Sequence, residues 1–247
     1  MADRPRGRVN ARGARRREAD GGEHAPPAAA PERVQRGSRQ RGERTRESIV
    51  RATLRVIAAQ GVGGVTHRAV AREARVNLSL TTYYFVDLYD LVAAAFRDLM
   101  QRSQAELGLR WSQVLPRIRR DAAGALRTRK GRGQLRDALA RQFVDFLHHK
   151  ILHNRVDLAA EHHFLFEGLV DPRLTKLAEL HRARLAAPIV RLCRLLRSDA
   201  PALDADLLLG TAMRLEYEAL LVPPERYDVA RLRRAIRRVL GWILEVG

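Results

Sequence analysis

The sequence is poor in cysteine. Cys193 is the single thiol among 247 residues, so the chain cannot form an internal disulfide or build a zinc site from several cysteines. The residues around Cys193 are mostly apolar, as expected of an inert thiol in a protein core rather than a redox sensor.

Long hydrophobic runs are also missing. No apolar stretch approaches the roughly 20 residues that a membrane-spanning helix needs. The N-terminal residues are basic, but no apolar segment of the kind found in secretory signals follows them. We therefore expect a cytoplasmic protein that has no membrane partner.

Sequence signatures of common enzymes are absent. The chain has no glycine-rich phosphate loop, no Gly-x-Ser-x-Gly and no His-Glu-x-x-His. His149 and His153 have the i, i+4 spacing of paired metal ligands, but no third ligand stands at a fixed spacing from them. We expect no catalytic residues, no cofactor and no metal. A helical enzyme that merely carries a DNA-binding motif stays a weak alternative.

Basic residues outnumber acidic ones, and nearly all of them are arginine. There are 46 Lys+Arg against 28 Asp+Glu, for a formal net charge of +18, and only Lys130, Lys150 and Lys176 are lysines. A charge of this size makes a polyanion such as nucleic acid a strong candidate partner.

Residues 1–42 contain few large apolar side chains and are rich in Arg, Gly, Ala and Pro. Such a segment cannot bury enough apolar surface to offset its ordering entropy, so we predict a disordered basic tail. Its arginines could add affinity for DNA phosphates without adding specificity. Alternatively, the tail does not take part in binding.

From Glu43 onward the chain has the apolar spacing of successive helices and no alternating pattern typical of strands, which predicts an all-α fold. A first helix ends at Gly61, and Thr66 is a suitable N-cap for a second helix. Asn77 and Asp87 are the expected caps of the next two helices. Further on, Asp171-Pro172 is expected to open a long helix, and the basic stretch 127–133 is expected to be a loop.

The segment from Thr66 to Phe85 predicts two short helices joined by a tight turn, which is the geometry of a helix-turn-helix. The second helix of such a motif enters the DNA major groove. Its hydroxyl and aromatic residues can bond phosphates or base edges: Ser79, Thr81, Thr82, Tyr83 and Tyr84. We expect Phe85 to be buried. The Tyr83 side chain could instead be buried in the core, and its position in the helix favours this alternative to DNA contact.

Residues 43–100 resemble the DNA-binding domain of the TetR family of transcriptional regulators. The resemblance rests on a helix ending at Gly61, the segment THRAVAREARVNLSLTTYYF, and a capped helix starting at Asp87. It implies a DNA-binding domain of three helices that contains the helix-turn-helix, followed by a helical domain at 101–247. The chain departs from the family pattern at Arg75 and Ser79, where Gly is common, and at Leu88, where Lys is common.

The same resemblance assigns roles within the motif. It implies that Thr66 caps the second helix and touches phosphate, that Arg68 contacts a base or phosphate, and that Tyr84 contacts phosphate. Exposed positions of the recognition helix fall on Asn77, Leu78, Ser79 and Thr82. Double-stranded DNA is the implied partner.

For residues 101–247 the resemblance implies a small-molecule effector, whose identity is unknown, and a homodimer. The last two helices carry apolar stripes that would form the dimer interface: Leu203, Leu207, Gly210, Tyr217 and Leu221, then Val229, Leu232, Ile236, Val239, Leu240 and Ile243. Internal packing of both helices is the alternative. The candidate pocket residues are the aromatics and histidines of the middle helices: Trp111, Phe143, Phe146, His149, His162, His163 and Phe166.

The sequence thus favours a sequence-specific DNA-binding transcriptional regulator, as a repressor that a small molecule releases from its operator. The alternative is a constitutive basic DNA-binding protein of nucleoid type that has no effector. Sequence preference at physiological salt distinguishes the two, because a repressor binds its site roughly a thousandfold or more tighter than random DNA.

Overall fold

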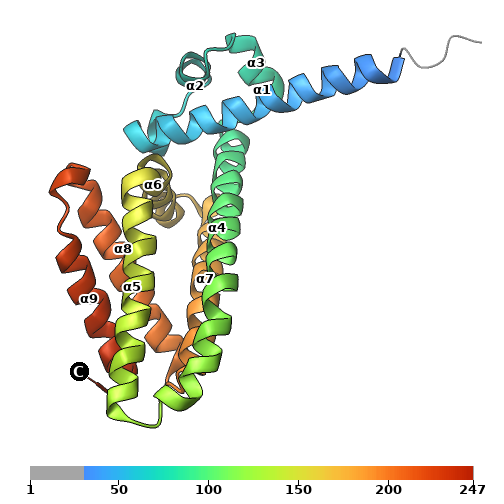
Figure 1. Cartoon of the computed structure of the whole chain (residues 1–247). Helices are drawn as coiled ribbons and strands as arrows, with labels where there is room; N and C mark the ends of the chain where they lie inside the picture. The colour runs from blue at the N-terminus through green and yellow to red at the C-terminus, as the bar shows by residue number, and fades with distance from the viewer. Residues whose placement is uncertain (1–30, 247) are drawn as a thin grey trace, which may run out of the picture. The chain divides into compact units, whose positions relative to one another are not determined.

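The computed structural model describes the backbone of residues 31–246 and the side chains of residues 40–246. Within this range the chain contains nine α-helices, two short 3-10 helices and no strand, which confirms the all-α prediction (Figure 1). The helices are α1 (Pro31–Gln60), α2 (His67–Ala74), α3 (Leu78–Tyr84), α4 (Leu88–Ala125), α5 (Arg129–His153), α6 (Arg155–Val170), α7 (Pro172–Leu195), α8 (Pro201–Leu220) and α9 (Val229–Ile243). The 3-10 helices are η1 (Val62–Gly64) and η2 (Pro224–Arg226).

The chain divides into two units between Arg41 and Gly42. Helix α1 begins at Pro31, so the described backbone of residues 31–42 is helical where the sequence predicts a disordered tail. Proline suits the first turn of a helix, and the Glu, Gln and Arg residues that follow are good helix formers. The rest of the predicted tail, residues 1–30, lies outside the described residues.

The predicted helix boundaries in the motif are largely confirmed. The hydroxyl of Thr66 accepts a hydrogen bond from the backbone N–H of Ala69 at 3.0 Å, which caps α2. Asp87 caps α4 in the same way, accepting from the N–H of Tyr89 at 2.9 Å. Asn77 stands at the N-cap of α3, but its side chain makes no capping bond. Gly61 ends α1 with a positive φ of 72°, a conformation that glycine adopts without strain.

Two predictions about the C-terminal helices need correction. The stretch 127–133 is a loop only at Arg127 and Thr128, because Thr128 caps α5 by accepting from the N–H of Gly131 and the helix begins at Arg129. The predicted domain boundary at 100–101 falls inside α4, which runs without interruption from Leu88 to Ala125. Asp171 and Pro172 open α7 as predicted, with the carboxylate of Asp171 accepting from the N–H of Arg173.

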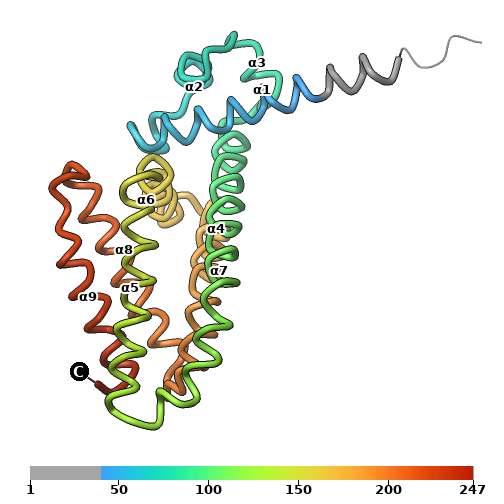
Figure 2. Tube along the Cα trace, viewed as in Figure 1, coloured from blue at the N-terminus to red at the C-terminus, as the bar shows by residue number. Residues whose placement is uncertain are grey.

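Two large hydrophobic cores and one small cluster lie within the unit 42–247, among the helices whose course Figure 2 traces. One joins α1, α2 and the start of α4 to α6 and α7, where the rings of Phe96 and Phe164 stack with centroids 4.3 Å apart. The other joins the second half of α4 to α5, α7, α8 and α9. Because Phe164 of α6 and Leu174 of α7 belong to the first core, the N-terminal helices share one core with two of the C-terminal helices.

The apolar stripe of α9 faces this second core. Leu232, Ile236 and Leu240 are fully buried, and Ile243 is 8% exposed. The prediction that this stripe forms a dimer interface is therefore wrong, and the alternative of internal packing holds for α9. The stripe of α8 differs, because Leu203, Leu207, Tyr217 and Leu221 are all exposed in the single chain.

Candidate DNA-binding surface and buried pocket

Helices α2 and α3 meet through a tight turn at Arg75, Val76 and Asn77. The N–H of Val76 bonds the carbonyl of Ala71 at 3.0 Å, which closes the end of α2. Arg75 adopts the left-handed conformation, with φ 56° and ψ 43°, where glycine is the usual residue. The turn therefore forms despite an unfavourable residue, and the family difference at Arg75 has a structural cost.

Thr81 lies on the buried side of α3. It is fully buried, and its hydroxyl donates to the carbonyl of Leu78 at 2.7 Å and to that of His67 at 3.5 Å. The assignment of Thr81 to DNA binding is wrong, because this side of α3 packs against α2. Thr81 instead holds α3 against the start of α2.

The opposite side of α3 is exposed. Ser79 and Thr82 lie on it, and the Thr82 hydroxyl donates to the carbonyl of Ser79 at 3.1 Å. Tyr83 is 77% exposed, so the alternative that it belongs to the core is wrong. Asn77 and Leu78 are exposed at the start of the helix, as are Thr66 and Arg68 at the start of α2. These residues could all reach a DNA groove or its phosphates.

Tyr84 and Phe85 lie on the inner side of the motif. Tyr84 is half-buried, and its ring meets that of Tyr83 edge to face at 5.1 Å. Phe85 is buried as predicted, and the guanidinium of Arg46 lies over its ring at 5.0 Å. Arg46 therefore places a positive charge beside the motif from helix α1.

Three of the seven candidate pocket residues line one cavity. Trp111, Phe143 and Phe146 contribute to a cavity of about 140 Å³ among α4, α5, α7 and α8. The Trp111 and Phe143 rings meet edge to face at 6.0 Å, and the Arg110 guanidinium lies 5.2 Å from the centre of the Phe146 ring.

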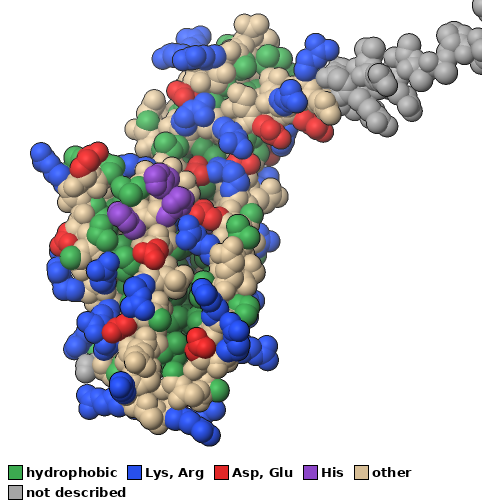
Figure 3. Space-filling model, in the orientation of Figure 1, with side chains coloured by type: hydrophobic (Ala, Val, Ile, Leu, Met, Phe, Trp, Pro, Cys, Tyr) green, Lys and Arg blue, Asp and Glu red, His purple; other side chains and the backbone are tan. Residues whose placement is uncertain are grey.

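The other four candidates lie elsewhere. His162, His163 and Phe166 line a separate, open groove beside Arg55 and Tyr217. His149 is exposed and stacks near His153 at 4.6 Å between ring centres. Figure 3 shows histidine side chains gathered on one face of the molecule. Periodicity could not separate these residues from the cavity, because the two faces of α6 are both partly apolar.

A buried charge cluster lies at the inner end of the cavity. The Lys150 ammonium of α5 contacts the Glu161 carboxylate of α6 at 3.1 Å and that of Glu216 of α8 at 2.9 Å. The Nε2 atom of His181 lies 2.7 Å from the other oxygen of Glu161. His181 is fully buried, and the Glu161 and Glu216 side chains are only 6% and 7% exposed. Four separate helices thus contribute to one polar network.

Contacts within the network shift the pKa values of its two carboxylates in opposite directions. Burial alone would raise the pKa of Glu161, but the charge of Lys150 and the hydrogen bond from His181 outweigh it and hold that pKa well below its usual range. Burial, aided by the negative charge of Glu161, raises the pKa of Glu216 despite Lys150. Burial would lower the pKa of Lys150, and the two carboxylates reverse this effect and raise it.

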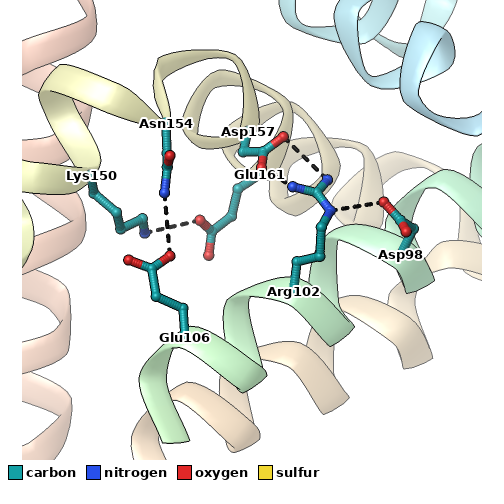
Figure 4. Close-up of polar contacts among 7 residues, drawn as sticks. All are labelled: Asp98, Arg102, Glu106, Lys150, Asn154, Asp157 and Glu161. Atoms are coloured by element: carbon teal, nitrogen blue, oxygen red, sulfur yellow. Dashed lines mark hydrogen bonds and ion pairs between the residues drawn. The ribbon is translucent and has the colours of Figure 1, made fainter. Parts of the chain in front are cut away.

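Polar contacts continue from the cavity along α4 (Figure 4). Glu106 of α4 accepts a hydrogen bond from the side-chain amide of Asn154 at 3.2 Å. One turn closer to the motif, Arg102 pairs with Asp98 of its own helix at 2.9 Å and with Asp157 of α6. These contacts fix α4 against α6.

The sequence indicated little of this network. Glu161 and Glu216 fall in segments with helical apolar spacing, but nothing in that spacing shows that their side chains point inward. One usable signal was available, because Lys150 is one of three lysines in an arginine-rich chain and lies between the apolar residues Leu147 and Ile151. His181 lies on the apolar face of α7 and is buried together with the apolar side chains of that face.

Cys193 is buried, and burial raises the pKa of its thiol to about 11, which fits an inert core residue. Among the described residues, no group of three His, Cys, Asp or Glu side chains is placed to hold a metal ion. No helix in the described part of the chain is long and apolar enough to cross a membrane.

Comparison with solved structures places this arrangement among known proteins. A transcriptional regulator from Rhodococcus sp. Rha1 matches 81% of the chain and 96% of its own length, with a TM-score of 0.61 and 21% identity. A TetR-family member from Streptomyces coelicolor A3 matches 79% of the chain and 97% of its own length, with a TM-score of 0.51 and 26% identity. The multidrug-binding protein EbrR, in complex with ethidium, matches 79% of the chain and 98% of its own length, with a TM-score of 0.52 and 26% identity.

No protein-family model matches the sequence, and no curated protein matches it either. The exposed helix-turn-helix and the helical body behind it define an all-α regulator with an N-terminal DNA-binding motif. The Rhodococcus protein is a transcriptional regulator, the Streptomyces protein is a member of the TetR family and EbrR is a multidrug-binding protein, and each match covers most of this chain. In fold, the described part of the chain is similar to transcriptional regulators of the TetR family.

Proposed function

We propose that the protein binds a specific DNA site through α2 and α3 and represses transcription until a small molecule releases it. The observation that carries the DNA-binding role is the two-sided character of α3. Thr81 and Phe85 anchor its inner side, while Ser79, Thr82 and Tyr83 project from its outer side. A rigidly held helix with exposed hydroxyls suits base reading in the major groove.

The contacts fall into two groups. We infer that Ser79, Thr82 and Tyr83 meet base edges, while Thr66 and Arg68 meet phosphates. Leu78, which is 45% exposed, offers an apolar contact for a thymine methyl group. Asn77 can donate from its amide to a phosphate oxygen, since no capping bond occupies its side chain.

The effector role rests on the cavity and on helix α4. EbrR, which resembles this chain, is a multidrug-binding protein that has been crystallised with ethidium. In this chain α4 starts at the motif with Leu91 and Phe96 in the first core, and its later residues Glu106 and Trp111 line the cavity. A ligand that favours another position of α4 would lower DNA affinity by its preference between the two states.

We infer that the functional form is a homodimer built on α8. Leu203, Leu207, Tyr217 and Leu221 lie on one face of this helix and are exposed, from 46% for Tyr217 to 66% for Leu221. Gly210 lies on the same face, and a side-chain carbon added there would meet nothing within 4 Å, which permits close helix approach. Two copies would present two recognition helices to neighbouring major grooves, about 34–36 Å apart.

Selection of DNA from a random pool by the purified full-length protein tests the regulator role. The selected site should bind about a thousandfold or more tighter than a scrambled site at physiological salt. Similar affinities for both would contradict the proposal and would favour a constitutive nucleoid-type protein. Addition of a cavity ligand to the specific complex then tests effector release separately.

A further inference from the structure

Acidic side chains outnumber basic side chains in the lining of the cavity. Three carboxylates, those of Glu106, Glu161 and Glu216, face two cations, Arg110 and Lys150. Lys150 serves Glu161 and Glu216 at once, whereas Arg110 stands 4.0 Å from Glu106. One negative charge therefore has no cation of its own among the lining residues.

His181 contacts Glu161 through its Nε2 atom but is not one of the residues that line the cavity. Its Nδ1 atom is buried and has no hydrogen-bond partner among the described residues.

Glu216 is the carboxylate that has no cation of its own. Lys150 of α5 is its ion-pair partner in the described part of the chain, and Lys150 is shared with Glu161 of α6. The raised pKa of Glu216, caused by burial and by the charge of Glu161, agrees with this geometry. A further cation in the cavity would stabilise its ionised form.

Most of the rest of the wall is apolar and aromatic, and its uncharged polar residues are Ser103, Gln113 and Gln142. Besides Trp111, Phe143 and Phe146, it contains Leu107, Val114, Leu139, Leu147, Leu185, Ile189, Leu209, Ala212 and Met213. Aromatic faces attract cations, as the position of Arg110 over Phe146 already illustrates. The volume of about 140 Å³ is close to that of apolar cavities known to hold one benzene-sized ring.

We propose that the cavity binds a small organic monocation, with a single ring or a body of similar size, whose ammonium group faces Glu216. The apolar body then lies against Trp111, Phe143 and Phe146. An anion would place a further negative charge beside the three carboxylates, and a neutral molecule would offer Glu216 no cation. This ligand class rests on the effector role proposed above, and it specifies what the effector is.

Three ring compounds of nearly equal shape test the proposal by calorimetry with the full-length protein and without DNA. Benzylamine is a cation at pH 7, benzyl alcohol is neutral and benzoate is an anion. Benzylamine should bind at least about tenfold more tightly than the other two. Equal or tighter binding of benzyl alcohol or benzoate, or no binding of benzylamine at about 10 mM, would overturn the proposal.

A matched pair of variants locates the charge. Glu216→Gln should reduce the affinity for benzylamine about tenfold and leave that for benzyl alcohol unchanged. Glu218→Gln is the control, because Glu218 lies on the same helix outside the cavity lining and pairs with Arg214 and Arg231. An equal loss in both variants would overturn the role of Glu216. If Glu216→Gln does not fold, the three-compound comparison on the wild-type protein decides.

The effect of the ligand on DNA affinity is measured in a separate experiment from ligand binding. If benzylamine binds as expected but leaves the affinity for the selected DNA unchanged, the ligand class stands and the proposed effector-release mechanism fails. If DNA binding is specific but benzylamine does not bind, the regulator stands and the ligand class fails.

Discussion

Helix α3 exposes Thr82 and Tyr83, whereas α5, α6 and α8 bury Lys150, Glu161 and Glu216. An exposed polar group already bonds to water, so it can exchange that water for DNA at little cost to folding. A buried polar group depends on its protein partners, and its loss affects folding and ligand binding together. The two regions should therefore respond to mutation in different ways.

The largest effect should come from a charge placed in the second core. Leu240 is fully buried, so Leu240→Arg should destabilise the protein by about 4 kcal/mol or more, because an unpaired charge is forced into the core. Leu207→Arg, on the exposed face of α8, should instead leave the fold intact and yield monomers. Thermal unfolding and light scattering separate these outcomes. A folded monomer from Leu240→Arg would restore α9 as the interface.

The second-largest effect is expected from a mutation in the buried charge cluster. Glu161→Gln should cost about 2–4 kcal/mol at neutral pH, because Lys150 loses one of its two carboxylates and His181 loses its charged partner. Since the pKa of Glu161 is lowered by folding, its contribution is present above the ordinary carboxyl range and is lost as pH falls below it. The difference from wild type in urea unfolding should therefore narrow as pH falls from 7 to about 3. A constant difference would argue against an ionised Glu161.

Thr81→Val should have a smaller effect, about 0.5–1.5 kcal/mol of destabilisation, because the hydroxyl bonds two backbone carbonyls within the motif. The same change at the neighbouring exposed position, Thr82→Val, should leave the free energy of unfolding within about 0.5 kcal/mol of wild type. Chemical denaturation of the pair provides the comparison. Equal destabilisation in both would show that α3 does not have one buried and one exposed side.

The smallest effect is expected at the turn. Arg75→Gly should relieve the left-handed strain at this position and stabilise the protein by about 0.5–1 kcal/mol, partly offset by the greater freedom of glycine in the unfolded chain. A small rise in melting temperature checks this. A fall would mean that the Arg75 side chain contributes more than its backbone strain costs.

Local signals made much of this fold predictable from sequence. Thr66, Asp87 and Asp171 are capping residues that bond backbone groups two or three positions away, so their roles need no tertiary information. The apolar spacing that starts at Leu91 likewise fixes the inner face of α4. Helix identity and order therefore follow from nearby residues.

What could not be predicted depends on which surfaces meet in three dimensions. The stripe of α9 is equally suited to an internal core or to a partner subunit, and only packing against α5 and α8 decides. Thr81 and Thr82 differ in role because α2 covers one side of a helix with two turns. Lys150, Glu161 and Glu216 come from three helices, and no spacing along the chain connects them.

The central claim is that the outer side of α3 reads DNA sequence. The most direct test of this claim is to measure the base preference at each position of the selected site. Wild-type protein and Thr82→Val are compared against the selected site and all its single-base-pair variants. The account predicts that Thr82→Val changes the preference at one or two base pairs, each by about 1–3 kcal/mol, while melting temperature and preference elsewhere are unchanged. An identical preference profile in the two proteins, or a uniform loss of affinity at every site, would contradict it.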